Sequence, residues 1–111
     1  MPNIMTIDGT LQIGIEHGGQ RHKDFTLRVP TLEDVENAIE EAGPDACNAR
    51  MARHKWALCL TRLGDIPAKE ITAELLGELP APEFGVIKAA EDELIKKLLA
   101  SSAESSAASE K

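Results

Sequence analysis

The sequence predicts an α+β domain in which one N-terminal β-hairpin packs on three to four α-helices and a disordered C-terminal tail follows. Two periodic patterns lead to this fold class. Apolar and polar residues alternate in two stretches within residues 11–29, as in strands with one buried face. From residue 31 onward, apolar residues recur every three to four positions, as in amphipathic helices.

The hairpin is expected over residues 11–29, with its turn at Gly18-Gly19, because glycine readily adopts the positive backbone angles of such turns. Its apolar face consists of Leu11, Ile13, Ile15, Phe25, Leu27 and Val29. An isolated hairpin is only marginally stable in water. We therefore expect this face to pack on helices, where six such side chains contribute on the order of 10 kcal/mol before chain entropy is subtracted.

Four helices are expected after the hairpin, at about residues 31–42, 45–63, 73–79 and 82–100. Thr31 and Asp34 form a capping-box pattern at the start of the first helix. Thr72 is a candidate cap for the third helix, and Pro82 is a favourable first residue for the fourth.

A single domain is expected over residues 11–100, after a flexible lead-in at residues 1–10. The tail at residues 101–111 reads SSAESSAASEK and contains no apolar residue larger than Ala. Such a segment cannot bury enough surface to offset the entropy lost on ordering. We therefore expect the tail to be disordered.

The first helix is expected to bury the stripe Leu32, Val35, Ile39 and Ala42. The carboxylates at this helix and its exit are expected to face water, where ion pairs with the second helix contribute at most about 1 kcal/mol each. These carboxylates are Glu33, Asp34, Glu36, Glu40, Glu41 and Asp45.

The chain of 111 residues is acidic, with 19 Asp and Glu against 12 Lys and Arg, and its net charge is −7. A surface of this sign repels phosphate backbones and anionic lipids. The aromatic residues are Phe25, Trp56 and Phe84, too few for the stacking platforms of single-strand binders. Neither nucleic acid nor a membrane is therefore expected as the main partner.

The cysteines and the N-terminal sequence indicate the cellular compartment in which the protein is expected. Cys47 and Cys59 are twelve residues apart in one expected helix, a rise of roughly 18 Å that prevents a disulfide. Unpaired thiols are typical of a reducing compartment. The chain shows neither a signal peptide nor an apolar stretch long enough to span a membrane. The sequence therefore predicts a cytoplasmic protein.

No motif of nucleophilic catalysis or phosphate binding is present, so neither an enzymatic activity nor a cofactor is expected. One alternative is a small metal-dependent enzyme, in which His17 and His22 bind a metal together with Glu16 or Asp24. The favoured interpretation of the two histidines is that they are exposed loop residues, because metal sites usually show closer ligand spacing.

Core packing is the favoured interpretation of two groups of apolar residues, and both groups are also candidates for binding a partner. Trp56 is the single tryptophan, a residue type enriched in interface hot spots. The second group, at the end of the last expected helix, is Leu94, Ile95, Leu98 and Leu99. Such a cluster, if exposed, forms a docking or self-association surface.

Three short phrases follow one another along the chain. They are LRVPT at residues 27–31, CLTRLG at 59–64 and TAELLGELP at 72–80. An acidic helix start follows the first phrase, and an Arg-rich helix leads into the second. In their order and spacing these phrases resemble the Mu-like family of phage tail assembly chaperones, over roughly residues 10–100.

The resemblance implies a non-enzymatic helper of long-tailed phages or prophages in the host bacterial cytoplasm. Such a chaperone acts on the tape-measure protein while the tail tube polymerises around it, so the tape-measure and tail-tube proteins are the expected partners. The resemblance assigns no binding residue. The alternative is a small regulatory or antitoxin-like adaptor that binds another protein or DNA. Its basic face would consist of Arg50, Arg53, Lys55 and Arg62.

Overall fold

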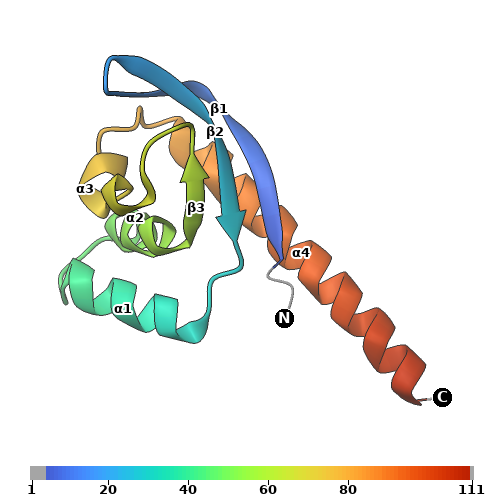
Figure 1. Ribbon diagram of the computed structural model, residues 1–111. Helices are drawn as coiled ribbons and strands as arrows, with labels where there is room; N and C mark the ends of the chain where they lie inside the picture. Colours follow the sequence, from blue (N-terminus) through green and yellow to red (C-terminus); the bar gives the residue numbers. More distant parts are fainter. Residues whose placement is uncertain (1–4, 111) are drawn as a thin grey trace.

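The computed structural model describes residues 5–110, and the side chains of residues 5–102. It confirms the α+β class, with a three-stranded antiparallel sheet in the order β1-β2-β3 and helices packed against it (Figure 1). The elements are β1 (Thr6–His17), β2 (Gln20–Arg28), α1 (Leu32–Ala42), α2 (Asn48–Cys59), β3 (Leu60–Leu63), the 3-10 turn η1 (Ala68–Glu70), α3 (Ala73–Leu76) and α4 (Glu83–Glu110).

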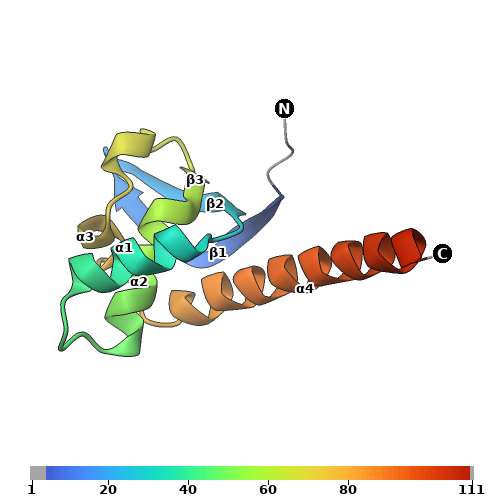
Figure 2. The ribbon, with the colours of Figure 1, turned by 90° about the horizontal axis from the view of Figure 1, so that it is seen from below.

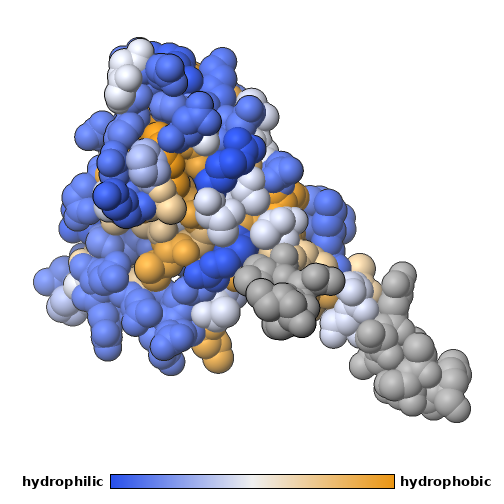
Figure 3. All heavy atoms as spheres, in the orientation of Figure 1, coloured by the Kyte–Doolittle hydropathy of each residue, from blue (hydrophilic) through white to orange (hydrophobic). Residues whose placement is uncertain are grey.

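One face of the sheet carries the core, and the other face is polar. The buried core includes Leu11, Ile15, Phe25, Leu27, Trp56, Cys59, Leu60, Leu63, Ile66, Ile71, Leu76 and Ile87. On the opposite face, Thr26 donates a 2.7 Å hydrogen bond to Asp8, and Thr10 donates a 3.2 Å hydrogen bond to Asp24. Most of the surface seen in Figure 3 is hydrophilic, as expected for an antiparallel sheet covered on one side.

The strand β3 was not expected from the sequence. The helix predicted over residues 45–63 is shorter, and residues 60–63 instead pair with β2, with Phe25 opposite Leu63 and Thr26 opposite Arg62. Leu60 and Leu63 are buried, while the two residues between them are exposed. The free edge of β2 therefore decides the conformation of a segment whose local pattern also fits a helix.

The hairpin begins earlier than expected. β1 starts at Thr6, so the described part of the predicted lead-in at residues 1–10 is mostly strand, and residues 1–4 lie outside the described chain. The turn at Gly18-Gly19 is confirmed, with φ angles of 62° and 80°. Both glycines adopt the backbone conformation that other residues rarely take.

A bulge in β1 changes which hairpin residues are buried. Thr10 pairs with Asp24 and Ile15 pairs with His22, so β1 contains extra residues between these pairs. Within the bulge Ile13 is 43% exposed, which corrects the expectation that it shares the core face with Leu11 and Ile15. A bulge breaks the alternation of faces because its extra residues have no cross-strand partner.

The amide groups of this bulge bind the carboxylate of Glu83, the first residue of α4. Its oxygens accept hydrogen bonds from the backbone N–H groups of Gln12 (3.0 Å), Ile13 (2.7 Å) and Gly14 (2.7 Å). The Glu83 side chain is fully buried. Gly14 has a φ of 90°, and a Cβ there would lie 2.7 Å from the carbonyl oxygen of His22. Glu83 therefore ties the start of α4 to β1.

Two opposing effects act on the pKa of Glu83. Burial raises it, whereas the hydrogen bonds from Gly14, Ile13 and Gln12 and the nearby charge of Lys23 lower it. The net result is a pKa below the usual value of 4.5. The carboxylate is therefore the favoured form in the folded protein, and its ionisation stabilises the fold.

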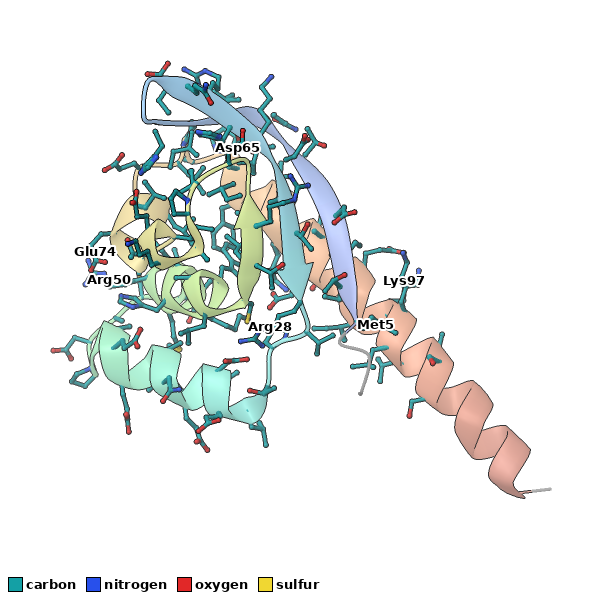
Figure 4. All side chains as sticks on the ribbon, in the orientation of Figure 1. Met5, Arg28, Arg50, Asp65, Glu74 and Lys97 are labelled. Atoms are coloured by element: carbon teal, nitrogen blue, oxygen red, sulfur yellow. The ribbon has the colours of Figure 1, made fainter. Side chains whose placement is uncertain are left out.

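The helix α1 packs with a different face from the one expected. Arg28 holds Asp34 through two hydrogen bonds of 2.7 and 3.1 Å and donates a third, of 2.9 Å, to the carbonyl of Leu58 (Figure 4 labels Arg28). Asp34 is consequently buried, and this contact lowers its pKa strongly. Leu32 and Ile39, predicted as buried, are 82% and 46% exposed.

Two helix caps agree with the sequence, whereas Pro82, the expected first residue of the last helix, lies just before α4. Thr31 and Asp34 form the expected capping box, and Thr72 caps α3, where its hydroxyl accepts a 3.1 Å hydrogen bond from the N–H of Leu75. The helix predicted over residues 73–79 is shorter, because α3 spans only Ala73–Leu76.

The last helix is longer than expected. α4 runs to Glu110, so no boundary appears at residue 100 and residues 101–110 continue the helix, in place of a tail without secondary structure. The sequence after Gly85 contains no Gly or Pro that would end it, and Ala is the strongest helix former. No helix within residues 5–110 combines the length and the apolar character needed to cross a membrane.

We predict that Glu83→Gln destabilises the fold on the order of 3 kcal/mol, because buried N–H groups of the bulge lose charged acceptors. The control is Glu93→Gln, an exposed position on the same helix. Urea unfolding monitored by circular dichroism measures the free energy of unfolding of both variants. Equal stability of the two variants would contradict the assigned role of Glu83.

The lowered pKa of Glu83 also predicts a difference in pH dependence. Its stabilising contribution is complete above the unfolded-state pKa and is lost as the pH falls through the lower folded-state pKa. The Glu83→Gln variant should therefore lose less stability than the wild type on acidification below about pH 4.5. Parallel pH curves for the two proteins would argue against this linkage.

Candidate functional site

The structure separates the five residues predicted to bind a partner into two groups. Trp56 and Leu94 are only 3% and 0% exposed, so they belong to the interior. The prediction that these two residues contact a partner is therefore wrong. Ile95 and Leu98 are each 37% exposed, and Leu99 is 64% exposed. These last three residues remain available to a partner.

We call the surface formed by Ile95, Leu98 and Leu99 the α4 end. The three residues have i, i+3 and i+4 spacing, so they lie on one side of the helix. The three residues lie near the middle of α4, where the helix begins to extend beyond the sheet and the other helices in Figures 1 and 2. The α4 end is thus an apolar strip on an extended helix, next to the cations Lys96 and Lys97.

A second surface, which we call the α2–α4 groove, lies between α2, α3 and the start of α4. It has a volume of about 360 Å³, is open to solvent, and is lined by residues that include Arg50, Arg53, Trp56, Leu79, Phe84 and Ile87. The rings of Trp56 and Phe84 lie 5.1 Å apart at 54°. Trp56 is buried in the wall, while Phe84 is 41% exposed at the rim.

The groove is basic, although the protein is acidic. Its lining contains Arg50 and Arg53 and no carboxylate. Arg53 is fixed by a 2.7 Å hydrogen bond from Nη1 to the carbonyl of Ala73, and Gly77 leaves room for it, since a Cβ there would lie 2.6 Å from Nη1. Within the part of the chain whose side chains are described, neither arginine forms an ion pair.

The two cysteines have contrasting environments. Cys47 is exposed at the start of α2, on the wall of the groove, where the backbone N–H of Arg50 lowers the pKa of its thiol. Burial raises the pKa of the Cys59 thiol to about 12. Both are free thiols.

The histidines do not form the metal site considered from the sequence. His22 is buried, where its Nδ1 accepts a hydrogen bond from the N–H of Asp65 and its Nε2 lies 3.1 Å from the carbonyl oxygen of His17. His17 contacts Glu70 instead, at 2.8 Å. Among the described side chains, no three His, Cys, Asp or Glu residues are grouped as metal ligands. The view of His22 as an exposed loop residue is also wrong.

One further buried carboxylate joins two helices. Glu91 of α4 is 2% exposed and lies 2.8 Å from Nζ of Lys55 on α2. The geometry is that of an ion pair, without a well-directed hydrogen bond. Lys55 is therefore used inside the molecule, so it is not part of a free basic face.

Sequence reasoning identified Trp56 but missed the groove around it. The groove needs three segments that are distant in the chain. The packing of Trp56 against Phe84 joins α2 to α4, and the hydrogen bond from Arg53 to Ala73 joins α2 to α3. Comparison of the chain with known protein families, with curated proteins and with solved structures gives no match.

We predict that a thiol reagent such as dithionitrobenzoate modifies Cys47 rapidly in the native protein, while Cys59 reacts only after unfolding. The reason is that the thiolate is the reactive form and burial disfavours it at Cys59. Absorbance at neutral pH measures the rates, and Cys47→Ser should remove the fast phase. Two equally fast thiols in the native protein would contradict the buried position of Cys59.

Proposed function

We propose that this chain is a non-enzymatic phage tail assembly chaperone that binds the tape-measure protein in the host bacterial cytoplasm. The observation that carries the proposal is the α4 end, where three apolar side chains are exposed on an extended helix. The ordered phrases of the sequence support the choice of family. The tail-tube protein is a second partner in this scheme.

The α4 end suits a long helical partner. Tape-measure proteins of such phages are expected to be helix-rich chains with apolar stripes, which aggregate unless they are covered before assembly. An apolar strip with i, i+3 and i+4 spacing packs against a stripe of the same kind. The net charge of −7 keeps the chaperone soluble while its strip is exposed.

The structure favours this function over a DNA-binding adaptor. An adaptor needs the basic residues on one free face, yet they are divided among different tasks. Lys55 pairs with Glu91, and Arg62 lies on β3 beside Thr26, so only Arg50 and Arg53 remain together, at the groove. No continuous cationic strip along α2 therefore supports contacts with a phosphate backbone.

The double variant Leu98→Asp/Leu99→Asp tests this proposal. We expect it to fold normally and to lose binding to helical tape-measure segments about tenfold or more, since two apolar contacts become charged and must be desolvated. Co-purification of the chain with segments of a long-tailed phage tape-measure protein measures binding. Circular dichroism confirms the fold.

The matched control is Leu32→Asp, because Leu32 is 82% exposed on α1, away from the α4 end. The control should bind as the wild type does. Retained binding by a folded Leu98→Asp/Leu99→Asp variant would refute the α4 end as the binding surface, and equal loss in the control would show a general effect of charge.

A further inference from the structure

We infer that the α2–α4 groove is a second binding site, which takes an acidic segment of a partner protein through one large apolar side chain flanked by carboxylates. This site is separate from the α4 end and does not depend on the function proposed for it. The inference rests on the charge of the groove, its apolar floor and its position.

The charge of the groove is opposite to that of the molecule. The chain has a net charge of −7, yet the groove lining holds two arginines and no carboxylate. Glu74 lies at the same edge of the molecule in Figure 4, but no ion pair joins it to Arg50. Arg53 is held in place before any ligand arrives by its hydrogen bond to Ala73. A fixed cation reduces the entropy lost on binding.

The beginning of α2 adds to the positive potential. The N-cap Cys47 and the first-turn residue Arg50 line the groove, and the helix dipole places partial positive charge at this end of α2. The N–H groups of this first turn, that of Arg50 above all, lower the pKa of the Cys47 thiol. Carboxylates of a ligand are stabilised in the same way.

The other part of the groove is apolar. Trp56, Leu76 and Ile87 are buried in its wall, and Phe84 extends this wall to the exposed rim. A volume of about 360 Å³ is at the lower end of the range of ligand pockets, roughly 300–1,000 Å³. This space suits one or two anchoring side chains of a peptide, with neighbouring carboxylates at the arginines.

Charge complementarity disfavours the α4 end of a second copy as the occupant. The apolar residues of the α4 end are adjacent to Lys96 and Lys97. Insertion of Leu98 or Leu99 into the groove would bring these lysines toward Arg50 and Arg53, and like charges in contact oppose binding. An acidic partner segment has the opposite and favourable arrangement.

The test uses two synthetic peptides of about 15 residues, long enough to form a helix on binding. One carries Leu at every third or fourth position with Glu between, and its twin carries Lys in place of Glu. Fluorescence of Trp56, the single tryptophan, and protection of Cys47 from alkylation report on the groove itself. Full-length protein is used throughout.

We expect the acidic peptide to shift the Trp56 fluorescence and to protect Cys47, with an affinity that falls as salt is added. Arg50→Glu should weaken the affinity for the acidic peptide about tenfold, because one favourable contact is lost and a repulsive one is gained. Phe84→Ala should weaken it as well, through the apolar part. Arg62→Glu, which makes the same charge change on β3, should leave the affinity unchanged.

Three results would overturn the inference. The first is that neither peptide protects Cys47, and the second is that the Lys twin protects it as well as the Glu peptide does. The third is protection that rises with protein concentration in the absence of peptide, since a second copy would then fill the groove. Arg50→Glu places an acidic residue in the first turn of α2, which helices favour, so the variant remains a folded and informative test.

Discussion

The arrangement of this domain depends on one buried carboxylate, Glu83, which binds three consecutive N–H groups of the β1 bulge. A bulge leaves these groups without strand partners, and burying them unpaired would oppose folding. Glu83 satisfies them and at the same time fixes where α4 begins. Both candidate surfaces follow from this position, because Phe84 enters the groove next to Glu83 and the α4 end lies farther along the same helix.

A second charged contact sets the orientation of α1. The bidentate bond from Arg28 draws Asp34 inward, so the helix buries Asp34 and Ala38 and exposes Leu32 and Ile39. Because Arg28 also binds the carbonyl of Leu58, one guanidinium connects the end of β2, α1 and α2. Charged groups in the interior thus decide the packing directions, while apolar burial provides most of the driving force.

The sequence predicted the features that depend on neighbouring residues. The Gly18-Gly19 turn, the Thr31 capping box and the Thr72 cap each have a local cause, and the structure contains all three. The features it missed depend on residues far apart in the chain. β3 forms because the edge of β2 is free, and the bulge forms because a glutamate about 70 positions later satisfies it. The groove was missed for the same reason, since its walls come from three separate segments.

The proposed chaperone would therefore use a rigid body to present two surfaces of different chemistry, an apolar strip and a basic groove. Amide hydrogen exchange measured by NMR tests directly whether Glu83 holds this body together. The N–H groups of Gln12, Ile13 and Gly14 open only when β1 and α4 separate, so they should exchange as slowly as those of Phe25 and Leu27 in the buried central strand β2. Exchange at these three amides as fast as at the exposed Gly18-Gly19 turn would contradict the account.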